Sequence, residues 1–99
     1  MKKRKSVIAR DARELAAALG LTPADAVEME MRSALNDKIV EIVERLGLTH
    51  AQVAKLSETS RTRITAIMNR NTQDVSMDLL LRILARLGYR AKIRFSKAA

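Results

Sequence analysis

Three glycines, Gly20, Gly47 and Gly88, divide the sequence into segments of helical length. Each follows a leucine and ends a run in which apolar residues recur every three or four positions. Glycine is favoured just past a helix C-terminus because it enters the left-handed backbone region without a Cβ clash. The chain has only one proline, and apolar residues make up 47% of it. This combination predicts a small all-α domain with a modest core.

The pattern predicts five helices, each with its own start signal. The first covers about residues 10–19. The second follows Thr22, which can cap it, has Pro23 at its first position and runs to about residue 46. The third starts at the capping box Thr49-His50-Ala51-Gln52. The last two are capped by Ser60 and Ser76 and are separated by a polar loop over residues 69–74.

Apolar spacing assigns an inward face to each of the four later helices. On the second helix, a break near Ser33 stays open because the apolar pattern before it is weaker. The residues expected to face the core are Met31, Leu35, Ile39, Ile42 and Leu46, then Val53, Ala54 and Leu56, then Ile64, Ile67 and Met68, and finally Leu80, Ile83, Leu84 and Leu87.

After Gly88 the apolar period changes from about four residues to two. Tyr89, Ala91, Ile93 and Phe95 alternate with basic residues, which is typical of a half-buried strand. The chain contains no second strand pattern, and a lone strand leaves its backbone groups unpaired. We therefore expect residues 89–95 to pair with a second copy in a homodimer. The alternative is a ragged, extended tail.

Charge is distributed unevenly around a net charge of +8. Residues 25–44 are mainly acidic, whereas residues 45–99 contain only three acidic residues among many arginines and lysines. A basic C-terminal half is the footprint of a polyanion binder, although charge alone also serves solubility. The basic residues 1–9 are expected to form a flexible arm, which either stays solvated or follows DNA or another protein. Residues 10–99 are expected to form one domain.

Residues 48–68 pair two short capped helices through a tight turn, the layout of a DNA-binding helix-turn-helix. In that motif the start of the second helix enters the major groove, where arginine can contact guanine and threonine can contact a base or a methyl group. The residues predicted to contact bases are Arg61, Thr62, Thr65 and Ala66. Those predicted to contact phosphates or flanking bases are Thr49, His50, Arg63, Asn69 and Arg70. The alternative for Arg61 and Arg63 is a solvated charge, and for His50 it is an ordinary helix-surface side chain. The alternative for Asn69 is a residue that only ends the helix.

The stretch LTHAQVAKLSETSRTRITAIMNR resembles the Cro/cI-type (XRE) helix-turn-helix, and residues 20 to 95 resemble the HigA-type antitoxin branch. SMDLLLRILARLGYRAKIRF is similar to the final helix and basic strand of that branch. The resemblance implies dimeric binding to a palindromic operator, neutralisation of a RelE-like ribonuclease toxin and repression of the pair's own promoter. The sequence departs from the family at Ser57-Glu58, where relatives usually carry Leu-Gly in the turn. A left-handed glutamate costs about 1 kcal/mol more than glycine.

Enzymatic activity is the least favoured function. The chain has no cysteine and one histidine, so we expect no metal site, no cofactor and no nucleophile–base pair. No apolar run approaches the roughly 20 residues of a membrane helix, and the basic start lacks the apolar stretch of a signal peptide. A cytoplasmic location is the default expectation. Two other functions stay open, a regulator without a toxin and a protein-interaction module that binds no DNA.

Overall fold

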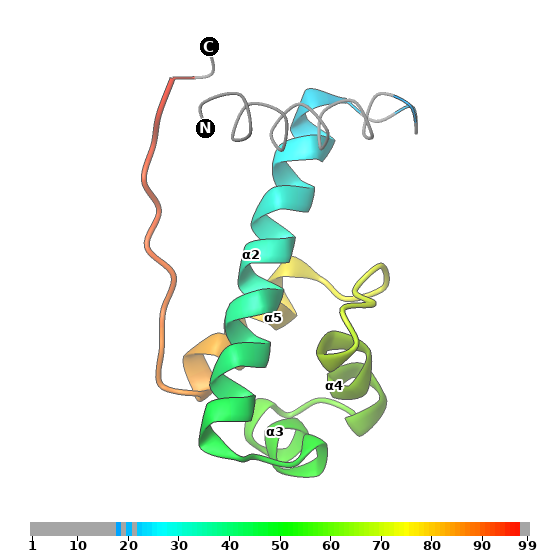
Figure 1. The fold of residues 1–99 in the computed structure, drawn as a ribbon, viewed down its shortest axis with the longest axis vertical. Coiled ribbons are helices and arrows are strands. Elements are labelled where there is room, and N and C mark those ends of the chain that lie inside the picture. The colour runs from blue at the N-terminus through cyan, green and yellow to red at the C-terminus, as the bar shows by residue number, and fades with distance from the viewer. Residues whose placement is uncertain (1–17, 19, 21, 98–99) are drawn as a thin grey trace, which may run out of the picture. The chain divides into compact units, whose positions relative to one another are not determined.

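The computed structural model describes residues 18, 20 and 22–97 (Figure 1). These residues form four helices, α2 (Pro23–Leu46), α3 (His50–Ser57), α4 (Arg61–Met68) and α5 (Met77–Arg86). The basic arm and most of the first predicted helix, residues 10–19, lie outside the described residues. The all-helical prediction is confirmed for the described part of the chain. None of the helices described is long and apolar enough to cross a membrane.

The chain divides into two compact units, residues 1–32 and 33–99. In the first unit a capping box starts α2. The Thr22 hydroxyl oxygen accepts from the Asp25 amide at 3.1 Å, and the Asp25 carboxylate accepts from the Thr22 amide and hydroxyl, each at 2.9 Å. The hydrogen bond from the Thr22 amide has the larger effect and that from the Thr22 hydroxyl the smaller, and both lower the pKa of the Asp25 carboxyl below its usual value. Their stabilising effect is therefore present above the unfolded pKa and is lost as the pH falls through the lower folded value.

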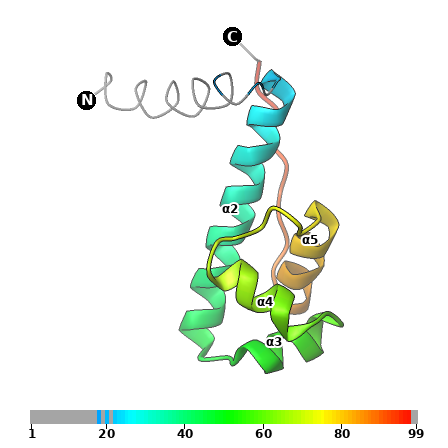
Figure 2. The ribbon, with the colours of Figure 1, turned by 90° about the vertical axis from the view of Figure 1, so that its right-hand side faces the viewer.

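In the second unit, α3, α4 and α5 gather beside the C-terminal half of α2 (Figures 1 and 2). The helices meet in one apolar core, and each contributes side chains at helical spacing. The buried members are Ile39, Ile42, Val43, Val53, Ala54, Ile64, Ile67, Val75, Leu79, Leu80, Ile83 and Leu84. Leu35, Leu48, Met68 and Leu87 pack against them as partly buried neighbours. The loop between α4 and α5 joins this core through Val75.

Local start and stop signals are confirmed in the second unit. Thr49, Ser60 and Ser76 are N-caps, each accepting a hydrogen bond from a backbone amide three residues later. The box at Thr49 is complete, since its amide also donates to the Gln52 side chain at 2.8 Å. Gly88 has a positive φ of 91° just beyond α5. These features depend on residues close in sequence, so local chemistry was sufficient to predict them.

Three predicted core positions are wrong. Leu56 is 45% exposed, and Met31 and Leu46 are about half exposed. On α3 the inward face runs through Val53, Ala54 and Ser57, which places Leu56 on the outer side. On α2 the apolar face does hold Ile39 and Ile42, and the helix continues without a break through Ser33.

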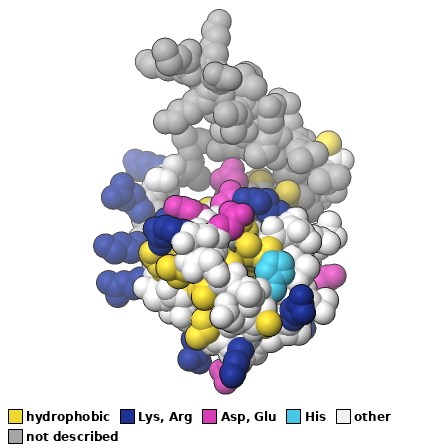
Figure 3. All heavy atoms as spheres, turned by 60° about the horizontal axis from the view of Figure 1, so that its bottom comes forward, with side chains coloured by type: hydrophobic (Ala, Val, Ile, Leu, Met, Phe, Trp, Pro, Cys, Tyr) yellow, Lys and Arg dark blue, Asp and Glu magenta, His cyan; other side chains and the backbone are white. Residues whose placement is uncertain are grey.

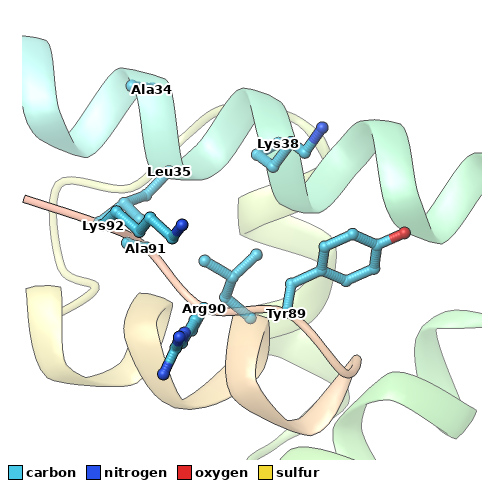
Figure 4. A pocket seen from close by; sticks show the side chains of 8 residues that line it. Ala34, Leu35, Lys38, Tyr89, Arg90, Ala91 and Lys92 are labelled. Carbon is cyan, nitrogen blue, oxygen red and sulfur yellow. The ribbon is translucent and has the colours of Figure 1, made fainter.

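Residues 89–97 form neither helix nor strand, and all are exposed. The strand predicted over residues 89–95 is thus absent from the single chain. A strand exists only through ladder hydrogen bonds to a neighbour, and no other part of the described chain supplies one. The start of this tail lies beside α2 and borders an open pocket of about 240 Å³ (Figure 4). The residues that line it are Ala34, Leu35, Lys38, Leu84, Tyr89, Arg90, Ala91 and Lys92.

Candidate nucleic-acid interface

The motif consists of α3, the turn Glu58–Ser60 and α4. Its two helices are packed through their inward faces, where Val53 of α3 and Ile64 and Ile67 of α4 are fully buried. The Ser60 hydroxyl accepts from the Arg63 amide at 3.1 Å and fixes the start of α4. The opposite side of that first turn is therefore directed away from the core.

Arg61, Thr62 and Arg63 are all exposed at the start of α4. Neither arginine makes an ion pair or hydrogen bond through its side chain to another described residue. Several other arginines of the second unit are engaged, for example Arg82 and Arg86. Free guanidinium groups next to free backbone N–H groups give this end of α4 a concentrated positive potential.

Thr65 and Ala66, one turn further along α4, are half-buried. The Thr65 hydroxyl lies 2.9 Å from Nδ1 of His50, the first residue of α3. This bond joins the two helices of the motif directly. It places His50 and Thr65 together, although they were predicted for different kinds of contact. Of the predicted base-contacting residues, Arg61 and Thr62 thus have free side chains, and Thr65 has an engaged hydroxyl.

The other predicted contact residues lie at the two edges of the motif. Thr49 is the exposed N-cap of α3, and Asn69 is the exposed C-cap of α4. Arg70 is exposed but its Nε donates to Asp37 Oδ1 of α2 at 3.0 Å. An exposed ion pair of this kind contributes little stability and breaks readily when a phosphate competes. Figure 3 shows this end of the unit, with the histidine side chain on the surface and Lys and Arg side chains at the edges.

Sequence reasoning missed a buried polar contact that holds α4 in place. Asn36 of α2 is 3% exposed, and its Nδ2 donates to the carbonyl oxygen of Ile67 at 2.9 Å. Helical spacing indicates that Asn36 lies on the inward face of α2, because it precedes the buried residues Ile39, Val40 and Val43 by three, four and seven positions. A polar residue on an inward face generally has a bonded partner.

We expect Asn36→Leu to destabilise the protein by about 1 kcal/mol, because the hydrogen bond from the Asn36 side chain to the end of α4 is lost. The loss stays small because the Ile67 carbonyl also accepts from the Arg70 amide at 2.9 Å. Urea unfolding followed by circular dichroism measures it. The matched control is Asp37→Ala next door, which removes only the exposed pair with Arg70 and should cost less than about 0.5 kcal/mol. Equal costs for the two variants would contradict the assignment.

The turn itself adopts the conformation that a glycine would favour. Glu58 is the C-cap of α3 with φ 55° and ψ 48°, in the left-handed region. The Glu58 amide donates to Lys55 at 3.4 Å and the Thr59 amide donates to Ala54 at 3.0 Å. Ser57, just before it, is fully buried and its hydroxyl has no partner. The departure from Leu-Gly therefore leaves a helix-turn-helix backbone in place at the cost of local strain.

Comparison with known proteins agrees with this geometry. The profile of a family described as a helix-turn-helix domain matches residues 15–96. No curated protein and no solved structure matches the chain. The matched region includes α3, the turn and α4, together with α5 and most of the tail. With most of its length covered by that profile, the chain belongs to the helix-turn-helix domain family.

Proposed function

We propose that the protein is a sequence-specific DNA-binding transcriptional repressor that acts as a homodimer. The observation that carries the proposal concerns two arginines at the capped start of α4, the second helix of the motif. Arg61 and Arg63 are exposed there, and neither forms an ion pair with a described residue. Membership of the helix-turn-helix domain family supports DNA binding. In this family's docking geometry, residues at the start of that helix reach base edges in the major groove.

The roles proposed for individual residues follow from their positions. Arg61 and Thr62 read base edges, Thr65 and Ala66 offer methyl contacts, and Arg63 contacts a phosphate or a flanking base. Thr49, His50, Asn69 and Arg70 contact the backbone at the two edges of the motif. For Arg70 this contact requires release from Asp37, which an exposed pair permits.

The proposed dimer forms through residues 89–95. Ile93 is 73% exposed and Phe95 is 91% exposed, which is a large apolar surface for a tail that stays alone. In an antiparallel pair, Tyr89, Ala91, Ile93 and Phe95 would face the same side and be covered together. Tyr89 already contacts α2, since its hydroxyl accepts from Arg45, whose guanidinium lies 5.7 Å from the ring centroid. Figure 4 shows the side chains of Tyr89 and Arg90 leaving the tail in different directions.

The finer proposal is that the repressor is the antitoxin of a type II pair. It is supported by the resemblance to the HigA-type branch, which implies a RelE-like toxin partner and repression of the pair's promoter. The exposed acidic residues Glu41 and Glu44 of α2 offer a surface for a basic partner. Co-expression with the adjacent gene followed by pull-down tests this part. An adjacent gene whose product never associates would favour a stand-alone regulator.

DNA binding is tested by selecting duplexes from a random-sequence library with the full chain and measuring affinity as salt is raised. We expect a palindromic consensus and an affinity that falls by a factor of about 10³ or more between about 50 and 200 mM salt, because bound Lys and Arg release counterions. Failure to retain any duplex at the lower salt would contradict the proposal and favour a protein-interaction module.

A further inference from the structure

Two arginines of α5 converge on the strained turn between α3 and α4. Nε of Arg82 donates to the carbonyl oxygen of Ser57 at 3.0 Å, and its Nη2 approaches the carbonyl oxygen of Glu58 at 3.5 Å. Nη2 of Arg86 lies 3.3 Å from the Glu58 carboxylate. Arg82 therefore contacts the backbone of the turn, whereas Arg86 contacts only an exposed side chain.

The backbone groups that Arg82 contacts need a donor. The last carbonyls of a helix have no partner within the helix, and the negative end of the helix dipole lies there. Ser57 is the last residue of α3 and Glu58 is its cap. A guanidinium presents several N–H groups in a fixed plane, so one arginine can serve two successive carbonyls. A lysine can supply only a single point of charge at the same distance.

Glu58 makes this support necessary. Its left-handed backbone is unfavourable for any residue with a Cβ, so the turn gains from relaxing once an external donor is removed. Any relaxation changes the direction in which the chain enters Ser60 and Arg61. The reading end of α4 would then be displaced from the geometry that its core residues Ile64 and Ile67 set.

We propose that Arg82 is a positioning residue for DNA recognition. It holds the Ser57–Glu58 backbone in its left-handed turn, and so fixes the angle of α4, without contacting DNA. The inference rests on the proposed function, in which α4 reads the duplex. It assigns to α5 a role in recognition in addition to its role in the core.

The test compares Arg82→Lys with Arg86→Lys, each alone and combined with Glu58→Gly. Both lysine variants keep the positive charge, so a loss of DNA affinity in either one cannot come from a missing charge. In the free protein, Arg82→Lys should speed hydrogen exchange of the Thr59 amide, which closes the turn, by about tenfold. On a duplex selected with the wild-type chain it should weaken affinity about tenfold, because fewer molecules hold the competent geometry. Arg86→Lys should change either quantity less than twofold.

Glu58→Gly should restore both quantities to within about twofold in the Arg82→Lys background, because glycine holds the left-handed turn unaided. The salt dependence of DNA affinity should keep the wild-type slope in every variant, since no phosphate contact is removed. The proposal is overturned by unchanged Thr59 exchange in Arg82→Lys, by failure of glycine to rescue, or by an Arg82→Gln variant whose salt slope is shallower by about one ion. If the wild-type chain binds no duplex, the proposed function fails, and the exchange measurements alone decide whether Arg82 holds the turn.

Discussion

Arg61→Ala is expected to weaken binding to the selected duplex by about 10²-fold. A bidentate arginine–guanine contact contributes about 1–3 kcal/mol of discrimination. The proposed dimer presents the contact twice, so about 1.4 kcal/mol per contact gives a loss of about 10²-fold. Fold stability should change little, because Arg61 is exposed and its side chain makes no hydrogen bond or ion pair with another described residue. Fluorescence anisotropy with the selected duplex and with a scrambled one gives the affinity and the discrimination together.

Arg32→Ala is the matched control, because it removes the same charge from an arginine of α2 that pairs with Glu28 at 2.8 Å. It should reduce affinity for the two duplexes equally and by less than about threefold. A control variant as damaging as Arg61→Ala would show that only overall charge matters. Equal losses on selected and scrambled DNA for Arg61→Ala would place that arginine on the phosphate backbone instead of a base.

Removing residues 89–99 is expected to halve the mass of the protein in solution and to lower operator affinity by a factor of about 10² to 10⁴. The mass falls because the proposed strand pair is lost. The affinity falls because the second recognition helix no longer binds at the high effective concentration of a linked partner. Light scattering after size-exclusion chromatography measures the mass, and anisotropy measures the affinity.

The deletion should not unfold the chain, since the buried core ends at Leu84 and residues 89–97 are exposed. The double substitution Ile93→Lys with Phe95→Lys is a second variant that keeps the chain length and the Tyr89–Arg45 contact. It should be monomeric with a wild-type helical circular dichroism spectrum. A dimer that survives both changes would assign self-association to another surface.

Features set by residues near one another in sequence could be predicted. The N-caps Thr49, Ser60 and Ser76 and the stop at Gly88 all depend on residues within a few positions of the backbone they serve. Most of the core also followed from helical spacing.

Contacts between distant segments could not be predicted in the same way. Asn36 meets Ile67, Asp37 meets Arg70 and Arg82 meets Ser57 across at least 25 positions, and local patterns do not encode such pairs. Leu56 was misplaced because an apolar residue on a short helix fits two faces until the packing of Ser57 is known. The predicted strand needs a second chain, so neither the sequence nor a single copy determines it.

The hydrogen bond between His50 and Thr65 couples one position on α3 to one on α4. An attempt to change the DNA sequence that the protein recognises therefore has to treat the two positions together. A longer side chain in place of Thr65 would release the imidazole and alter two neighbouring contacts at once. Libraries that vary only the exposed start of α4 will therefore sample a restricted set of operators. Randomising His50 together with Thr65 opens combinations that neither substitution reaches alone.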